Sequence, residues 1–214
     1  MVNFMIAKKY EKDTESKILE AARRVFILKG LDGARMQEIA DEAGINKALL
    51  HYYFRSKDKL FMKIFIVEFG NFFPRLIPVM LSKDMDIDRK IRHFVDGYIE
   101  LFLKNPFLPA FVIREINRNP NLFKEFVKKS GVDIKMLNSI LTTLSDELGL
   151  AKREIMHLLV TLVSSCIFPF AGKPIIEGVL FDGNEKEYRK FLEERKIYVA
   201  EFAINYIKQI SKNK

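Results

Sequence analysis

The segment over residues 39–60 constrains this chain more than any other part of its sequence. Ile39 lies on the apolar face of one predicted helix, and Gly44 follows it where the chain can turn sharply at little steric cost. Asn46 is a favoured N-cap residue, and it predicts a second short helix over about residues 47–53. Two helices joined by a short turn that contains Gly form a helix-turn-helix, whose second helix is suited to a DNA major groove.

The same segment resembles the DNA-binding domain of TetR-type transcriptional regulators. Its matches to that family's pattern continue into the helix that follows the recognition helix: Ile39, Ala40, Ala43, Gly44, Ile45, Asn46, Lys47, Leu50, Tyr53, Phe54, Ser56, Lys57 and Leu60. Further matches lie upstream: Ile18, Leu19, Ala21, Ala22, Phe26 and Gly30. The resemblance covers residues 14–60 and implies an N-terminal three-helix DNA-binding domain. It also implies a C-terminal helical domain that binds a ligand and forms a dimer.

The sequence departs from the family's pattern at three places. Ala34 and Arg35 stand where the family usually opens a helix with Thr or Ser, and Leu49 replaces another Thr or Ser. His51 stands where Tyr is usual, with Tyr52 beside it. These departures leave room for an alternative function, a non-enzymatic helical module that binds a protein or a lipid and has reduced DNA binding.

Polar and basic side chains of the helix-turn-helix are the candidates for contact with double-stranded DNA. Lys and Tyr suit phosphate oxygens, which fix position, whereas contacts to base edges give specificity. Lys57 is expected in the first turn of a helix, where free N–H groups also favour phosphate. Leu49 could meet a thymine methyl group or be partly buried. The candidates are Arg35, Gln37, Asn46, Lys47, Leu49, His51, Tyr52 and Lys57.

Apolar residues recur with a period near 3.6 along the chain, and strand-like alternation is not seen, so the predicted fold is all-α. We expect a helix-turn-helix domain over residues 1–60 and a helical effector-binding and dimerisation domain over residues 61–214. A helix over about residues 56–73, ended by Pro74, would connect them. Further helices are expected over residues 14–29, 86–103, 152–168 and 185–210, with a Gly- and Pro-rich loop over residues 169–184.

The 19 Phe residues favour an apolar pocket in the second domain, because ligand pockets are mostly apolar with a few placed polar groups. Candidates for its walls are Phe65, Phe69, Phe72, Tyr98, Phe102, Phe111, Met156 and Phe168. Candidates for its polar groups are Arg114, Glu115, Asn117 and His157. Plain core packing is the alternative role for each of them. The expected effector is a small apolar or aromatic molecule.

A homodimer is expected because one recognition helix makes too few base contacts for a specific site, whereas two related by a two-fold axis read a palindrome. The segment over residues 152–168 is apolar almost all round, and such a helix needs partners on all sides. Candidates for the dimer interface are Leu159, Val163, Val199, Phe202 and Tyr206. The predicted function is that of a repressor that binds a palindromic operator as a homodimer and is released by a small apolar or amphipathic effector.

Other classes of protein find little support in the sequence. The net charge of +8 supports a polyanionic partner only weakly. The single Cys166 excludes an intrachain disulfide and suits a cytoplasmic location. Three dispersed histidines give no metal-ligand spacing, and motifs for a cofactor or for catalysis are not visible. The longest apolar run, over residues 155–170, is broken by polar residues, so a membrane span is not expected.

Overall fold

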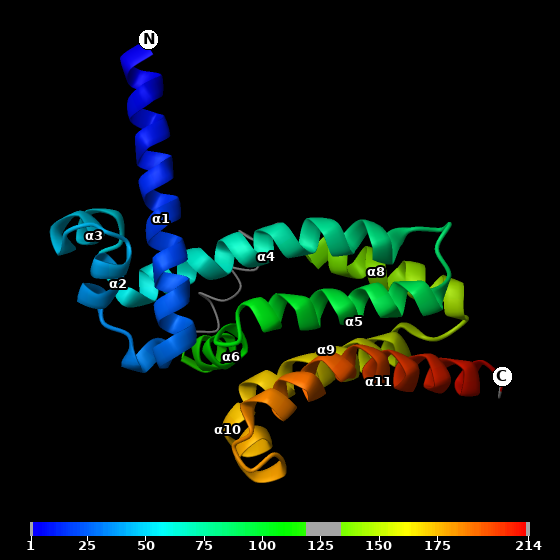
Figure 1. The fold of residues 1–214 in the computed structure, drawn as a ribbon. Coiled ribbons are helices and arrows are strands. Elements are labelled where there is room, and N and C mark those ends of the chain that lie inside the picture. Colours follow the sequence, from blue (N-terminus) through cyan, green and yellow to red (C-terminus); the bar gives the residue numbers. More distant parts are fainter. Residues whose placement is uncertain (1, 119–133, 213–214) are drawn as a thin grey trace. The chain divides into compact units, whose positions relative to one another are not determined.

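The computed structural model describes residues 2–118 and 134–212, and every regular element in these ranges is helical (Figure 1). The all-α prediction is therefore confirmed. The chain divides into two compact units, which we call unit 1 (residues 1–68) and unit 2 (residues 69–214). The division lies at residue 68, whereas the sequence suggested residue 60, and it falls inside a single helix, α4.

Unit 1 contains α1 (Val2–Gly33), α2 (Met36–Glu42), α3 (Lys47–Tyr53) and the first part of α4 (Lys57–Leu81). The first helix begins at Val2, twelve residues before the expected start at Thr14. Gly30 interrupts it with φ 66° and ψ 176°, a backbone conformation that glycine adopts at little cost. The sequence predicted that the first helix ends at Gly30, and the structure has a non-helical residue there inside a helix that continues to Gly33.

The core of unit 1 follows from the apolar stripe of α1. Ile18, Val25 and Phe26 on this stripe are buried, as the spacing of three and four residues predicts. The Phe26 ring packs against the Phe61 ring of α4 with centroids 5.0 Å apart. Full burial of a side chain of this size contributes about 1.5–3 kcal/mol. Leu50 of α3 is also fully buried, so the recognition helix is anchored to the same core.

The predicted end of α4 at Pro74 is wrong, because the helix continues to Leu81. Pro74 and Pro78 are four residues apart and share one face of the helix, and both are exposed. Each proline removes one hydrogen bond to the carbonyl four residues earlier. On the solvent side, water can satisfy those carbonyls, and the helix persists.

Unit 2 is a bundle in which α11 (Glu185–Lys212) packs along α5 (Ile87–Lys104) (Figure 1). The helix α9 (Lys152–Ala171) contacts α5, α11, α6 (Leu108–Arg118) and α8 (Ile134–Leu148). Ion pairs join α5 to α11. Glu201 pairs with Arg92 at 2.5 Å, Lys208 with Asp88 at 2.6 Å, and Lys196 with Glu100 at 2.5 Å.

The predicted loop over residues 169–184 is also wrong. The helix α9 continues through Pro169 to Ala171, and α10 (Lys173–Ile175) and the π-helix η1 (Ile176–Leu180) follow. Pro169 cannot donate to the carbonyl of Ser165, and that carbonyl instead accepts two hydrogen bonds from the Arg195 guanidinium of α11, at 2.9 and 3.2 Å. A side chain far along the sequence thus compensates for a proline that would otherwise end the helix.

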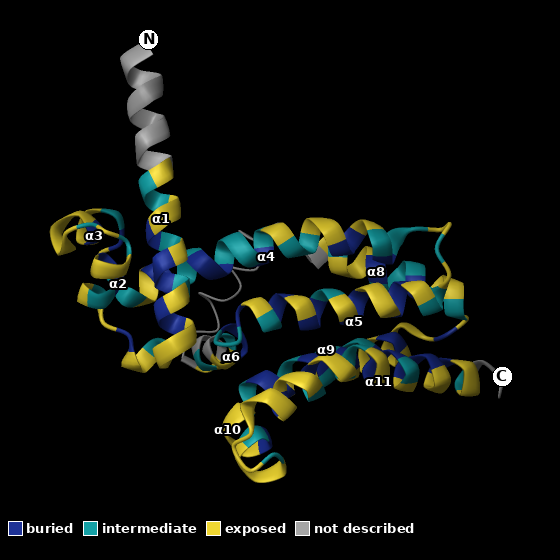
Figure 2. Ribbon diagram, viewed as in Figure 1, coloured by how far each residue is buried: buried dark blue, intermediate teal, exposed yellow. Residues whose placement is uncertain are grey.

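Apolar side chains remain exposed on unit 2. Ile175, Val179 and Leu180 of the α10 and η1 segment are exposed, as the shading of that region indicates (Figure 2). By length and composition alone, α4 and α9 could also cross a membrane, a test that core helices of soluble proteins pass as well. Only 33% of each apolar window is buried within the protomer. The other apolar side chains of α9 either line a cavity within unit 2 or are at least partly exposed on its surface.

Candidate DNA-binding helix and effector cavity

The start of α2 is stabilised without the Thr or Ser that is usual there. Arg35 occupies the N-cap position in an extended conformation, and its side chain makes no capping hydrogen bond. Instead, the Glu38 carboxylate accepts a hydrogen bond from the backbone N–H of Arg35 at 3.2 Å. It also accepts one from the Lys29 ammonium at 2.9 Å, and that bond holds the pKa of Glu38 below its ordinary value. The carboxylate thus supplies one of the two hydrogen bonds of a capping box, the one to the N-cap N–H, while the bond that a Thr or Ser hydroxyl would accept is not made by the Arg35 side chain.

The turn between α2 and α3 places the recognition helix. Gly44 has φ +66°, which explains why glycine is used there. The Asn46 side-chain oxygen accepts the backbone N–H of Leu49 at 2.8 Å and caps α3. The structure therefore gives Asn46 a capping role, whereas the sequence also offered it as a DNA contact.

The outer face of α3 presents the candidate DNA contacts to solvent. Lys47, Leu49 and His51 are exposed, and Tyr52 is 74% exposed. A large aromatic side chain with so little burial contributes little to the core, so its position suits a contact outside the protomer. The structure brings these four side chains together on one short helix whose other face is anchored by the buried Leu50.

The remaining DNA candidates lie on α2 and at the start of α4. Arg35 and Gln37 are exposed, and the Gln37 amide donates to the Asp41 carboxylate at 2.8 Å. The Lys57 ammonium is half-buried and donates to the backbone carbonyls of Ala34 at 2.9 Å and Asp32 at 3.2 Å. Lys57 therefore ties the segment before α2 to α4. A phosphate contact for Lys57, as the sequence suggested, remains a prediction.

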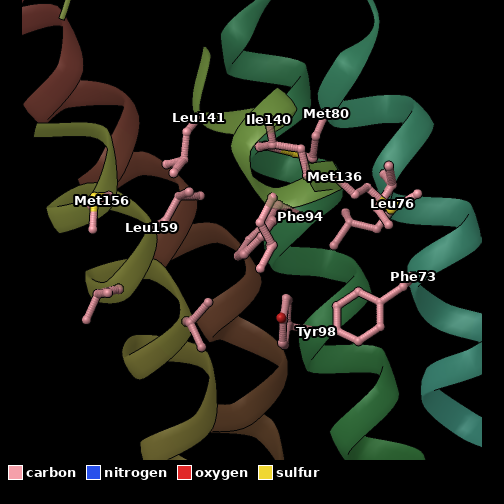
Figure 3. A pocket seen from close by; sticks show the side chains of 14 residues that line it. Phe73, Leu76, Met80, Phe94, Tyr98, Met136, Ile140, Leu141, Met156 and Leu159 are labelled. Atoms are coloured by element: carbon pink, nitrogen blue, oxygen red, sulfur yellow. The ribbon is translucent and has the colours of Figure 1, made fainter. Parts of the chain in front are cut away.

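An apolar cavity of about 280 Å³ lies within unit 2, between α4, α5, α8 and α9 (Figure 3). Among the described residues, all but one of the lining side chains are aliphatic, thioether or phenyl groups, and Tyr98 is the exception. They are Phe73, Leu76, Ile77, Met80, Phe94, Tyr98, Met136, Leu137, Ile140, Leu141, Met156, Leu159, Val160 and Val163. The volume is near the lower end of the range of about 300–1,000 Å³ that is typical of ligand pockets.

Only two of the proposed pocket residues, Tyr98 and Met156, line this cavity. Three other wall candidates are buried in the core: Phe65, Phe69 and Phe102. Phe72 is half-buried and packs against Tyr98, with ring centroids 4.8 Å apart. Phe168 is 59% exposed and covers Gly172. Among the polar candidates, Asn117 and His157 are exposed and Arg114 is half-buried, and none of the three lines the cavity. The side chains of Phe111 and Glu115 lie outside the described part of the structure.

Sequence reasoning missed the α4 wall of the cavity, formed by Phe73, Leu76, Ile77 and Met80. It ended the helix at Pro74, and the apolar residues beyond the proline lost their helical context. The stripe Leu76, Ile77 and Met80 still has the spacing of one helical face, and this signal could have identified the wall.

The proposed dimer residues separate into two groups. Leu159 and Val163 line the cavity, and Val199 is only 5% exposed in the core of unit 2. Phe202 and Tyr206 are 65% and 48% exposed on the outer face of α11. Phe202 and Tyr206 are therefore the most exposed members of this set.

Residues 18–64 match the sequence profile of the bacterial regulatory proteins of the tetR family. The chain is 25% identical over 195 residues to the "Probable HTH-type transcriptional regulator YttP" of Bacillus subtilis, covering 87% of this chain and 92% of that protein. It is 30% identical over 94 residues to the HTH-type transcriptional repressor NicS of Pseudomonas putida, covering 44% of this chain and 43% of NicS.

Solved structures share the fold. A TetR transcription regulator from Haloarcula marismortui has a TM-score of 0.61 at 19% identity, covering 91% of this chain and 98% of that one. The transcriptional regulator FadR from Bacillus subtilis, solved in complex with stearoyl-CoA, has a TM-score of 0.52 at 20% identity, covering 88% of this chain and 96% of FadR. The matched segment identifies an N-terminal DNA-binding domain of the tetR-family type, and the solved structures show that the chain as a whole shares their all-α fold.

Proposed function

We propose that this protein is a repressor that binds a palindromic operator as a homodimer and is released by a small apolar effector. The observation that carries the proposal is the exposed outer face of α3, with Lys47, His51 and Tyr52, on a helix fixed by the buried Leu50. The helix-turn-helix relatives NicS and SCO4008 of Streptomyces coelicolor are described as repressors, which supports the direction of control.

The proposed homodimer rests on the outer face of α9 and α11. Tyr198, Phe202 and Tyr206 are exposed on α11 and are four residues apart, so they form one apolar stripe. Phe168 adds exposed apolar surface on α9, which packs against α11. Exposed apolar surface of this kind is typical of an interface. A two-fold dimer through this surface would provide the two recognition helices that a palindrome requires.

The proposed release uses α4, which belongs to both units. Its first turn carries Lys57, tied to the segment that precedes α2, and its last part carries Leu76 and Met80 of the cavity wall. An effector that binds better to one arrangement of this wall shifts the population of that arrangement. The coupling free energy in such systems is typically about 1–3 kcal/mol. The complex of the structurally similar FadR with stearoyl-CoA supports a ligand-responsive function.

Selection of bound sequences from a random pool of duplex DNA tests the proposal. We expect a two-fold symmetric sequence with half-sites about one helical turn apart, roughly 34–36 Å. The Lys47→Ala variant should select a different base at one symmetric position if the ammonium reaches a guanine edge. The exposed Lys59 is a matched control, and Lys59→Ala should select the same sequence as the unmodified protein. Failure of the protein to enrich any duplex would overturn the proposal and favour a module that binds a protein or a lipid.

A further inference from the structure

The lining of the cavity is nearly devoid of polar chemistry. Tyr98 is the only one of its 14 lining residues whose side chain forms conventional hydrogen bonds. The others include three methionines, Met80, Met136 and Met156, whose flexible thioethers adapt to irregular shapes. Among residues 2–118 and 134–212, the lining thus contains a single hydroxyl and lacks a formal charge.

A cation on the same face of α5, Lys90, is already engaged by another side chain. Lys90 lies one helical turn before Phe94 and is fully buried, but it is not a lining residue. Its ammonium is hydrogen-bonded to the carboxylate of Glu147 on α8. Among the described residues, the lining offers no counter-charge to a ligand carboxylate, and loss of hydration by that group against these apolar side chains is unfavourable. A ligand ammonium would face the same penalty.

The size of the cavity limits the ligand. An apolar protein cavity of about 150 Å³ accepts benzene, which has six carbon atoms. A volume of about 280 Å³ is nearly twice as large and therefore accepts roughly ten to twelve non-hydrogen atoms.

The Tyr98 hydroxyl is held in place before a ligand arrives. Its ring packs against Phe72 and Phe94 with centroid distances of 4.8 Å each, and against Phe102 at 5.8 Å. Burial raises the pKa of Tyr98 well above its ordinary value, so the group remains a neutral hydroxyl throughout the physiological range. It can donate one hydrogen bond to a ligand oxygen and accept another.

We propose that the cavity selects neutral, mostly aliphatic molecules of roughly ten to twelve non-hydrogen atoms whose one hydrogen-bonding group meets the Tyr98 hydroxyl, and that it rejects carboxylates and amines of the same length. This inference takes the cavity as the effector site and in that respect rests on the proposed function. It narrows the effector from any apolar or amphipathic molecule to an uncharged one.

Isothermal titration of the full chain at pH 8, without DNA, with 1-decanol, decanoate and decylammonium tests the inference. We expect 1-decanol to bind with one molecule per protomer and the two ions to bind at least about tenfold more weakly. Tyr98→Phe should weaken decanol binding by about three- to tenfold, the effect of one hydrogen bond. Tyr53→Phe, which changes a tyrosine of unit 1 outside the cavity, is the matched control and should bind decanol as the unmodified protein does.

A second variant guards against binding elsewhere on the protein. Leu159→Phe fills part of the cavity and should abolish decanol binding, whereas Leu28→Phe, at an exposed position in unit 1, should not. Circular dichroism of each variant shows whether it remains folded.

The outcomes that would overturn the inference are distinct from failure of the proposed function. Binding of decanoate as tight as that of decanol, absence of decanol binding, or decanol binding that survives Leu159→Phe would each overturn it. Because the titration contains no DNA, it is independent of operator recognition. If decanol binds selectively but operator affinity does not change, the ligand class proposed for the cavity is supported. Only the proposed release from the operator is then contradicted.

Discussion

Replacement of Arg195 by Met should destabilise unit 2, and the structure gives the size of the effect. The guanidinium of Arg195 donates two hydrogen bonds to the Ser165 carbonyl, which Pro169 leaves without its helical partner. Burial lowers the pKa of Arg195, because an environment with less water disfavours the charged guanidinium. Hydrogen bonds from a charged donor contribute about 1.5–3 kcal/mol, and an orphaned buried carbonyl costs about 1–3 kcal/mol. We expect Arg195→Met to lower the free energy of unfolding by about 2 kcal/mol.

A double-mutant cycle with Pro169 isolates the proposed compensation. Pro169→Ala restores a backbone N–H that can donate to the Ser165 carbonyl within α9. In the Pro169→Ala background, the loss from Arg195→Met should therefore shrink to less than about 1 kcal/mol. Arg92→Met is the matched control, because Arg92 forms an exposed pair with Glu201 at 2.5 Å. Its replacement should cost much less than Arg195→Met does in the unmodified protein, because an exposed pair contributes little to stability.

Urea denaturation followed by circular dichroism at 222 nm measures each free energy. The decisive quantity is the difference between the two costs of Arg195→Met, with and without the proline. An equal cost in both backgrounds would show that Arg195 does not compensate for the proline, and the explanation for the continuation of α9 would then be refuted.

Three further predictions concern other parts of the molecule. Lys57→Met should lower both the stability of the protein and its affinity for the operator. The salt dependence of operator binding should stay unchanged, because the Lys57 ammonium is engaged by backbone carbonyls. A fall of about 0.9 in the slope of log affinity against log salt concentration would instead identify a phosphate contact. The double substitution Phe202→Glu and Tyr206→Glu should convert dimers to monomers, as measured by sedimentation velocity. An intact dimer would contradict the proposed dimer surface. Burial raises the pKa of the Cys166 thiol to about 12. At pH 8 the folded protein should therefore resist a thiol-specific disulfide reagent that reacts readily with the denatured protein. Fast reaction of the folded protein would show that Cys166 is accessible.

The helix-turn-helix was predictable because its signals are local. The turn requires the positive φ of Gly44, and Asn46 caps α3 through its own side chain, so both elements follow from residues close in sequence. The start of α2 was less evident, because Arg35 is not a capping side chain and the stabilising hydrogen bond runs from its backbone N–H to the Glu38 carboxylate. The apolar stripe of α1 is likewise a local pattern with a single structural solution.

The errors at the prolines have a tertiary cause. Pro169 remains inside α9 because Arg195, 26 positions later, satisfies the carbonyl that the proline releases. Pro74 remains inside α4 because it faces solvent. Neither of these effects can be predicted from residues close in sequence. Because α4 was predicted to end too early, its residues in the cavity wall were missed. The division of apolar residues between core, cavity and outer face is also tertiary, which is why Phe102 was indistinguishable from Tyr98 in the sequence.

A paired titration tests the central proposal, a repressor switched by a ligand, most directly. The affinity for the selected operator is measured by fluorescence anisotropy with and without saturating 1-decanol, and the affinity for decanol is measured with and without the operator. We predict that each ligand weakens the other by the same factor, about 5- to 150-fold, as linkage requires. Operator affinity that stays the same while decanol occupies the cavity would contradict the proposal.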